Sequence, residues 1–428
     1  MYDLIVVGGG AAGFFGAIHV AEQRPDLKVA ILEQGNKVLS KVRISGGGRC
    51  NVTHAEFNPA ELVKAYPRGE KELRGPFHVF QPSDTVAFFE ARGVPLKVEE
   101  DGRMFPESDS SQSIIDCFMD SVNTLGIHLI KNALVVEIIP VESPVHGKIW
   151  EVKTKSDSFH CNHLLLATGS SQKMWNLLKV LGHRIIDPVP SLFTFHITDT
   201  RIEGIQGVST NARVELVSRE LPGKKLSGAI RTSSKRSAGL TSEGPLLITH
   251  WGMSGPAILK LSAWGARILN EYNYRFRIRV NWTPDYHQEG MYAFLVEVKE
   301  VEARRTVFRT CPLEIPKRLW RKLVLAAGIT PDQKWAEVQK KQLQQLAAQL
   351  TSTEFLVEGK SPFKEEFVTA GGLDLREINF KTFESKLHER LYFAGEILNI
   401  DAITGGYNFQ NAWTGAYLAA RAITGSEN

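Results

Sequence analysis

The chain has few cysteines, and no two of them have the spacing of a redox pair or a metal-binding pair. Its four cysteines, Cys50, Cys117, Cys161 and Cys311, are far apart, and no C-x-x-C occurs. A dithiol redox centre and a cysteine-based metal site therefore have no support in the sequence. Unpaired cysteines are typical of a reducing compartment, and we expect a cytoplasmic protein.

Strong charge of one sign and long apolar runs are also lacking. The formal net charge is +4 over 428 residues, which by itself indicates neither a nucleic-acid nor an anionic-membrane partner. No stretch is long enough to span a bilayer. The apolar residues 2–21 hold Asp3, His19 and a glycine triplet and follow no basic segment, which argues against a signal peptide. We therefore expect a small-molecule substrate, no nucleic acid and no membrane, with the oligomeric state open.

Size and composition indicate a soluble protein of more than one domain. Hydrophobic residues make up 43% and charged residues 23% of the chain, which is typical of globular proteins. A length of 428 residues exceeds what one ordinary core accommodates, so two or three domains are expected. The sequence shows no internal repeat and no low-complexity segment.

The most informative feature is a glycine turn near the N-terminus. Residues 3–13 read DLIVVGGGAAG, in which Gly8, Gly10 and Gly13 fit G-x-G-x-x-G, and Glu33 ends a second apolar strand 20 residues later. In this pattern the glycines permit the turn, the approach of a pyrophosphate and close helix packing, and the acid accepts from ribose hydroxyls. The N–H groups that open the helix would face the phosphates. The pattern predicts a dinucleotide site; a glycine turn without ligand is the alternative.

A second glycine loop follows the acidic strand end. Residues 44–51 read ISGGGRCN, with Lys41 and Arg43 just upstream. Three consecutive glycines expose backbone amides and permit the approach of a flat or anionic group, while Arg49 adds a fixed cation. We predict that this loop lies beside the cofactor, where Arg49 would favour reduced, anionic flavin. A flexible surface loop is the alternative.

A third segment, residues 395–410, reads GEILNIDAITGGYNFQ. Asp401 is suited to hydrogen-bond a polyol such as a ribityl chain, and the amides at 406–408 would open the last helix. A helix N-terminus at the pyrimidine edge of a flavin stabilises the negative charge that reduction places there. The alternative is an ordinary docking helix.

The pattern of apolar residues predicts an α/β architecture with an insertion. Helices are expected at 82–92, 111–125, about 254–270, 332–351 and about 407–423, and strands at 134–139, 150–155, 159–162, 163–166, 193–197, 212–217, 246–248 and 391–394. The run Asp187-Pro188-Val189-Pro190 marks a change of character. We therefore predict a discontinuous domain, 1–188 with 355–428, and an inserted β-rich and helical region, 189–354.

Five motifs spread over almost the whole chain resemble one family. They are residues 8–13, 44–51 (ISGGGRCN), 250–257 (HWGMSGPA), 369–373 (TAGGL) and 404–413 (TGGYNFQNAW). In this order they resemble the BaiN-like (YhiN-type) NAD(P)/FAD-dependent flavoproteins of the glutathione-reductase-like FAD superfamily. One departure is Gly169-Ser170, where the family is expected to have Gly-Gly.

The resemblance implies a Rossmann-like FAD-binding domain with a parallel sheet and inserted β-barrel-like and small helical domains. It implies noncovalent FAD, and activities that include enone reduction in steroid acids and oxidation of small amines. The cofactor-binding residues expected from the motifs and the resemblance are Gly8, Gly10, Ala11, Ala12, Gly13, Glu33, Gln34, Lys41, Ser45, Gly46, Gly47, Gly48, Arg49, Cys50, Asn51, Val135, Val136, Ala167, Thr168, Gly169, Gly371, Gly372, Gly395, Glu396, Asp401, Gly406, Tyr407 and Asn408.

Catalytic residues are less evident than cofactor contacts. His250 could donate a proton or be structural, Tyr407 could act as an acid or only pack, and Cys50 lacks the partner that a redox thiol needs. We predict that the insert covers the flavin, with residues 250–254 and a basic run nearest the opening; an assembly surface is the alternative. The basic run is Lys224, Lys225, Arg231, Lys235 and Arg236.

The sequence predicts an FAD-dependent oxidoreductase that passes hydride through flavin N5 between NAD(P)H and an enone-like acceptor. No second G-x-G-x-x-G follows a strand, so NAD(P)H would bind transiently, against the flavin, without a Rossmann site of its own. Three alternatives stay open: a flavin oxidase of a small amine, an FAD protein that modifies tRNA, and a non-catalytic flavin redox sensor.

Overall fold

The computed structural model describes residues 1–144, 147–217, 239–360 and 368–425, arranged in two compact units. The first comprises Met1–Pro188 and Thr369–Asn428, and the second Val189–Val368. Residues 355–360, which the sequence placed with the first domain, lie in the second unit. The reason is strand pairing, because β16 (Thr353–Val357) and β17 (Gly359–Lys360) both pair within its sheet. The basic run at 224–236 lies outside the described residues.

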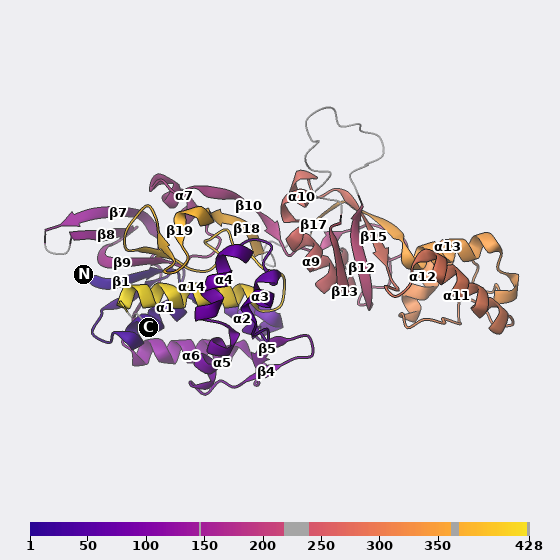
Figure 1. The fold of residues 1–428 in the computed structure, drawn as a ribbon, viewed down its shortest axis with the longest axis horizontal. Coiled ribbons are helices and arrows are strands. Elements are labelled where there is room, and N and C mark those ends of the chain that lie inside the picture. The colour runs from indigo at the N-terminus through magenta and orange to yellow at the C-terminus, as the bar shows by residue number, and fades with distance from the viewer. Residues whose placement is uncertain (145–146, 218–238, 361–367, 426–428) are drawn as a thin grey trace, which may run out of the picture. The chain divides into compact units, whose positions relative to one another are not determined.

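The first unit is built on a parallel sheet, seen with its helices in Figure 1. The parallel strands stand in the order β21-β9-β1-β2-β6. Their short runs of Val, Ile and Leu, largely buried, are typical of a parallel sheet covered by helices. Their bounds are β1 (Tyr2–Val7), β2 (Val29–Leu32), β6 (His128–Ile130), β9 (Ser158–Leu166) and β21 (Leu391–Phe393).

Antiparallel strands extend this sheet. The strands β19 (Ile378–Asn379) and β20 (Glu384–Ser385) follow β21, and β7 (Val135–Ser143) with β8 (Gly147–Thr154) forms a hairpin on β9. The sequence predicted two strands at 159–162 and 163–166, which is wrong. They form the single strand β9, whose first half pairs with β8 and whose second half pairs with β21.

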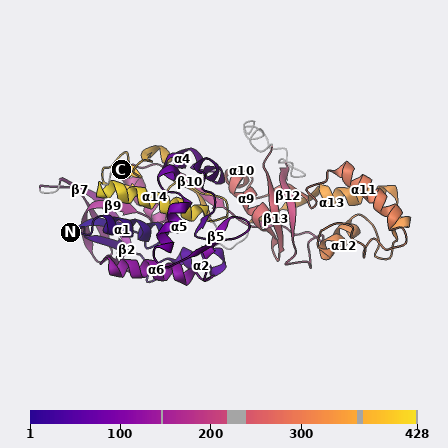
Figure 2. The same cartoon turned by 60° about the horizontal axis from the view of Figure 1, so that its bottom comes forward.

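Helices from both chain ends lie side by side against this sheet. Figures 1 and 2 show α1 (Ala11–Gln23) along α14 (Tyr407–Thr424), whose start and length agree with the prediction. Close packing is possible because Gly16 has no side chain: an added methyl would meet Leu165 of β9 at 2.7 Å and the Ala416 side chain of α14 at 3.6 Å. The other elements of the unit are α2 (Ser40–Gly48), β3 (Thr53–His54), α3 (Pro59–Leu62), α4 (Glu70–Val79), α5 (Pro82–Glu90), β4 (Leu96–Val98), β5 (Arg103–Pro106), α6 (Ser111–Thr124) and α7 (Gln172–Val180).

The second unit has an antiparallel sheet in the order β16-β15-β12-β13-β14-β11-β17. Its two edge strands, β16 and β17, are separated in sequence by Glu358 alone, so the sheet curls toward closure, as a β-barrel-like domain requires. The remaining strands are β11 (Phe195–His196), β12 (Ser209–Val217), β13 (Thr241–Thr249), β14 (Gly252–Ser254) and β15 (Phe276–Asn281). The short strands β10 (Ile185–Ser191) and β18 (Val368–Leu373) form a separate two-stranded ladder where the chain passes between the units.

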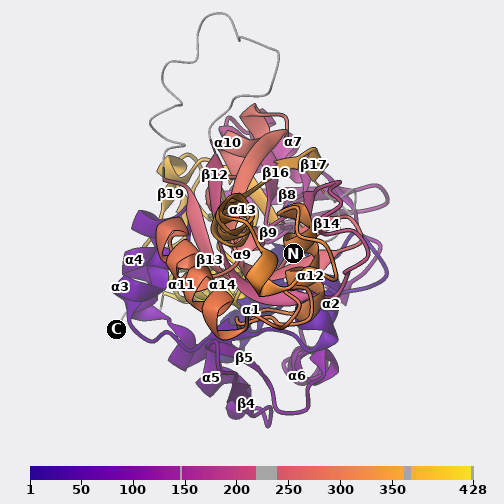
Figure 3. The same ribbon diagram turned by 90° about the vertical axis from the view of Figure 1, so that its right-hand side faces the viewer.

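Helices pack on the second sheet and beyond it. The helix expected at 254–270 is two helices, α9 (Pro256–Trp264) and α10 (Ala266–Glu271), divided at Gly265. Three more, α11 (Gln288–Val301), α12 (Lys317–Ala326) and α13 (Lys340–Thr351), gather in Figure 3. The helix predicted from residue 332 begins only at Lys340, because residues 335–337 form a 3-10 turn. Within the described ranges, no helix is long and apolar enough to cross a membrane.

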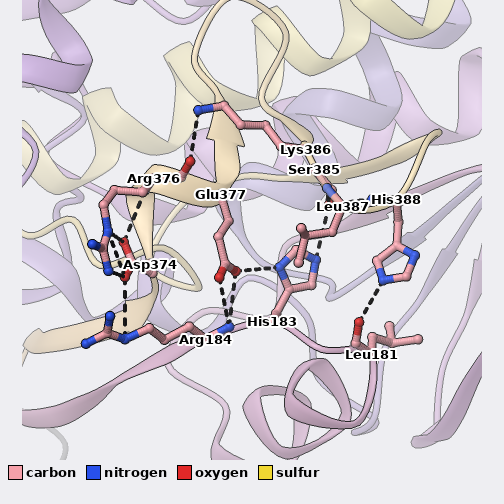
Figure 4. Close-up of polar contacts among 10 residues, drawn as sticks. All are labelled: Leu181, His183, Arg184, Asp374, Arg376, Glu377, Ser385, Lys386, Leu387 and His388. Atoms are coloured by element: carbon pink, nitrogen blue, oxygen red, sulfur yellow. Dashed lines mark hydrogen bonds and ion pairs between the residues drawn. The ribbon is translucent and has the colours of Figure 1, made fainter.

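A buried polar network fastens the C-terminal part of the first unit (Figure 4). His183 Nδ1 lies 2.8 Å from Glu377 Oε2, and Ser385 Oγ lies 3.2 Å from His183 Nε2. The order of groups is that of a serine–histidine–carboxylate triad. However, Ser385 is buried and its Oγ accepts the N–H groups of Leu387 and His388, both at 3.0 Å. The hydroxyl has no room to attack a substrate, so the network is structural.

A second, largely buried histidine makes the first unit sensitive to acid. The imidazole of His19 on α1 lies among the rings of Phe15, Phe88 and Tyr417. Burial lowers the pKa of His19 from 6.5 to about 3, and the charge of Arg92 adds to the effect. The unfolded chain therefore binds a proton at pH values where the folded protein does not, so stability falls as the pH drops below 6.5.

Replacing His19 by phenylalanine is expected to flatten this pH dependence. Between about pH 7 and about pH 4, His19 should lower the free energy of unfolding by about 3 kcal/mol, at about 1.4 kcal/mol per pH unit. His19→Phe keeps an aromatic ring in the cluster without the titrating group. Urea unfolding measured at both pH values compares the proteins, and an equal loss in both would show that His19 does not carry the effect.

Candidate functional site

The candidate site lies at one edge of the parallel sheet. Val7 at the end of β1 pairs with both Leu32 and Leu166, and Leu166 pairs with Phe393. The carboxyl ends of four parallel strands therefore meet there, which is where open α/β sheets bind ligands. The segments that leave this edge hold many of the predicted cofactor residues, in four groups: 8–13, 33–34, 167–169 and 395–396.

The three glycines of the first turn have different structural reasons. Gly8 has φ +115°, and an added methyl would lie 2.4 Å from the Ala167 carbonyl oxygen. A methyl at Gly13 would lie 2.0 Å from the Gly8 carbonyl oxygen. Gly10, in contrast, has an ordinary extended conformation, and a methyl there would meet nothing within 4 Å. The fold itself thus requires Gly8 and Gly13, while Gly10 leaves open space in front of α1.

Glu33 and Lys41 connect this turn to its neighbours. The Glu33 carboxylate accepts the N–H of Gly9 at 2.8 Å and that of Gly35 at 2.9 Å. Lys41 on α2 forms an ion pair with Glu396, in the loop after β21. In the same loop, a methyl at Gly395 would touch the Ala12 side chain at 3.4 Å, beside the first turn of α1. Predicted residues from three separate segments therefore lie together. Gln34 is exposed beside Glu33.

The second glycine loop follows a short helix that the sequence did not predict. The helix α2 extends to Gly48, but Ser45 leaves the helical conformation and Gly46, Gly47 and Gly48 have φ of 58°, 70° and 87°. A methyl at Gly47 or Gly48 would meet no atom within 4 Å. The loop therefore presents backbone to open space, as a group that approaches closely requires.

The structure gives two residues that follow these glycines contacts of their own. Arg49 donates to Glu99 at 2.6 Å and stacks on the Phe105 ring at 3.9 Å, and the Glu99 hydrogen bond raises the pKa of the guanidinium. The Glu99 carboxylate thus largely neutralises the charge of Arg49, so a direct effect of Arg49 on the flavin stays a prediction. Cys50 is fully buried, and burial raises the pKa of its thiol to about 12. It is a protonated core thiol at neutral pH.

Asp401 in the C-terminal loop is bound by an arginine that the sequence analysis missed. The Arg68 guanidinium donates to both carboxylate oxygens of Asp401, whose side chain has no exposed surface. The predicted contact of Asp401 with a polyol stays untested, and this geometry favours a positioning role. No sequence signal marked Arg68, because 333 residues separate the pair.

The start of α14 is fastened to the strand that follows the second loop. His54 on β3 stacks on Tyr407 with ring centroids 4.5 Å apart, and its Nδ1 lies 3.0 Å from the Gly405 oxygen. A methyl at Gly406 would meet the Thr53 oxygen at 2.4 Å. Burial raises the pKa of the Tyr407 hydroxyl, which stays protonated at neutral pH. The sequence did not single out His54.

Four further predicted residues lie at three places in the first unit. Asn408 holds the loop through Ala402, to which its amide group both donates and accepts. In the amide orientation that satisfies its neighbours, Asn51 accepts the Gly406 N–H at 2.9 Å. Val135 is buried and Val136 exposed at the start of β7.

Gly371 and Gly372 are required by close backbone packing. Added methyls there would lie 2.6 Å from Pro188 Cα and 2.6 Å from the Ile397 oxygen, respectively. His250 is exposed on the turn after β13 and belongs to the second unit.

The residues present fit a bound dinucleotide. The first turn of α1 has no side-chain cap and no acidic residue, so its N–H groups are available to an anion. Gly10 leaves room directly before that turn. The buried hydroxyl of Thr168, on the segment that touches Gly8, has no hydrogen-bond partner in the structure. A buried hydroxyl without a partner is costly, and a ligand at this edge would satisfy it.

A family model matches this chain. Residues 2–422 match the model described as HI0933-like protein Rossmann domain. The chain belongs to the HI0933-like family. The match covers almost the whole chain, so it spans both units.

Full-length relatives show how wide this family is. The chain is 25% identical to a ribosomal RNA dihydrouridine synthase of Haemophilus influenzae, over 98% of both chains. It is 26% identical to the enzyme of the same name from Escherichia coli, over 100% of this chain and 99% of the relative. It is also 26% identical to a 3-dehydro-bile acid delta(4,6)-reductase of Clostridium scindens, over 97% and 98%.

These findings confirm the family resemblance that the five sequence motifs indicated. The HI0933-like chain is a member of an FAD-dependent oxidoreductase family, with a Rossmann-like α/β fold and additional antiparallel sheets. Family membership implies FAD as the cofactor. The relatives differ in the substrates that their names state, an RNA and a bile acid, so the family alone does not determine the substrate.

Proposed function

We propose that this HI0933-like protein reduces a carbon–carbon double bond conjugated to a carbonyl, with NAD(P)H as the source of electrons. The observation that carries the proposal is the pair of reactions that its full-length relatives are named for. Dihydrouridine differs from uridine by two hydrogens across a double bond conjugated to a ring carbonyl. A delta-4 bond beside a 3-oxo group is likewise conjugated. One chemistry therefore serves both substrates.

The chain's own residues would bind and orient the cofactor. The open first turn of α1 would hold the pyrophosphate, and Glu33 would accept from ribose hydroxyls. The N-terminus of α14, which no side chain caps, would face the pyrimidine edge. Bound FAD supplies the hydride from N5.

A proton must also reach the carbon beside the carbonyl. Within the cluster of the first unit, the Tyr407 hydroxyl is a candidate donor because it carries a proton at neutral pH, but burial raises its pKa and so makes it a weaker acid. His250 stays a second candidate from the other unit. NAD(P)H would bind transiently against the flavin, and the cover that we predict from the insert is part of this proposal.

Anaerobic reduction of the purified yellow protein tests the proposed electron source. We expect NADPH or NADH to bleach the flavin absorbance within the mixing time of a manual experiment, and a panel of small amines to leave it unchanged. Bleaching by an amine, followed by recovery on admission of oxygen, would instead identify an amine oxidase. A flavin that none of these compounds reduces would support the redox sensor and contradict the proposal.

A further inference from the structure

Charge is divided unevenly between the two units. Residues 189–368 contain 26 Lys and Arg against 18 Asp and Glu, whereas the rest of the chain contains 25 against 29. The modest net charge of +4 therefore hides a basic second unit joined to an acidic first unit. A basic excess on one domain attracts polyanions.

The excess is concentrated in one stretch of the helical part. Residues 304–322 hold seven Lys or Arg and a single acid, Glu314. Four of the seven, Arg304, Arg309, Lys317 and Arg318, are exposed and have no ion-pair partner among the residues that the structure describes. Of the others, Arg305 pairs with Glu302 at 3.1 Å.

Contacts bring the two ends of this stretch together. The Arg321 guanidinium lies 5.3 Å from the centre of the Phe308 ring, and Trp320 Nε1 donates to the Val307 oxygen at 2.9 Å. The turn at 304–309 therefore lies against α12. We call residues 304–309 together with the exposed side of α12 the basic surface.

The basic surface includes cations at the N-terminus of α12, where the helix dipole disfavours positive charge. Lys317 and Arg318 occupy the first turn of α12, which has no acidic residue and no side-chain cap. Cations at a helix N-terminus oppose the helix dipole, so this arrangement costs some stability and adds to the positive potential. A local rule broken without a compensating contact is expected at functional sites.

The other side of α12 excludes a membrane-surface role for this helix. Leu319, Trp320, Leu323 and Val324 are at most 1% exposed and form part of the core of the second unit. An amphipathic helix that binds a membrane must place its apolar face in the lipid, and this face is already occupied. Most cations of the basic surface are arginines. The planar guanidinium group of arginine has several N–H donors whose geometry suits hydrogen bonds to phosphate oxygens.

We propose that the basic surface binds the phosphate backbone of an RNA that carries the reducible base. The inference rests on the proposed function, for which the double bond of a uracil ring is a suitable substrate. It adds the substrate class and the surface that holds it. It differs from the prediction that the sequence alone supported, a small-molecule substrate without nucleic acid.

The test is the binding of a fluorescein-labelled, uridine-rich RNA oligonucleotide to the FAD-loaded full chain. The variant Lys317→Gln/Arg318→Gln/Arg321→Gln is expected to bind about tenfold more weakly at moderate salt and to lower the slope of log affinity against log salt by about two. The control variant Lys71→Gln/Arg74→Gln/Lys173→Gln removes three exposed cations from the first unit and should bind like the unchanged protein. Equal weakening in both variants, or in neither, would overturn the proposal.

Two further measurements separate this inference from the proposed function. The variant in the basic surface should be reduced by NAD(P)H as fast as the unchanged protein, which shows that it is folded and loaded. If the protein reduces a small enone but does not bind RNA, the inference fails and the proposed function stands. Binding to phosphatidylserine vesicles in preference to RNA would likewise overturn the inference.

Discussion

Gly10→Ala is expected to yield a folded protein that retains little FAD. The added methyl meets no atom within 4 Å and the backbone at Gly10 is extended, so the apoprotein should be as stable as before. The methyl occupies the space before α1 that we assign to the pyrophosphate. Crowding of this kind costs about 1–3 kcal/mol, which corresponds to a loss of affinity of about five- to 150-fold. Titration of the apoprotein with FAD, followed by flavin fluorescence, measures it.

Gly75→Ala provides the matched control. Gly75 lies in α4, and a methyl there also meets nothing within 4 Å, but the residue is outside the candidate site. This variant should bind FAD normally, and no gain in stability is expected, because Gly75 precedes Pro76 and an added β-carbon would crowd the proline ring. Normal FAD affinity in Gly10→Ala would remove the pyrophosphate from this turn.

Arg68→Met is expected to destabilise the first unit by about 3–5 kcal/mol, because it leaves the fully buried Asp401 carboxylate without its partner. The loop at 401–408 leads into α14, so FAD retention should fall with stability. Thermal unfolding of the apoprotein and FAD titration measure the two effects separately.

The double variant Arg68→Met/Asp401→Leu tests whether the pair only positions the loop. Replacing both charges by apolar groups removes the buried unpaired carboxylate, so most of the lost stability should return. If Asp401 acts only on the loop, FAD affinity returns with it. A stable double variant that does not bind FAD would show instead that this ion pair contacts the cofactor.

Local patterns predicted the parts of the molecule that depend on neighbouring residues. The glycine turn at 8–13, the strand at 391–394 and the helix from Tyr407 were predictable because buried strands and glycine turns leave a signal within a few residues. The predicted start of a helix at residue 332 was wrong, because the true start depends on packing in the core and not on neighbouring residues. Its polar, Gln- and Lys-rich start has no local break, and the 3-10 turn at Trp335 arises from burial of that side chain in the core.

Long-range partners account for what the sequence could not predict. The partner of Asp401 is Arg68 and the partner of Arg49 is Glu99, and in both cases the fold creates the contact. The uneven division of charge is hidden in the net charge of +4, because the opposite excesses of the two units partly cancel over the whole chain. Motifs were sufficient to name the predicted cofactor residues. Several of their hydrogen-bond partners lie far away in the sequence and are determined by the fold.

The central claim is that this chain delivers hydride to a double bond conjugated to a carbonyl. The most direct test is to reduce the purified protein with one equivalent of NAD(P)H without oxygen, and then to add a conjugated enone or a uridine-containing RNA. The account predicts that the oxidised flavin absorbance returns in proportion to the acceptor added, with a matching amount of saturated product. A flavin that stays reduced with every such acceptor and recovers only when oxygen is admitted would contradict it.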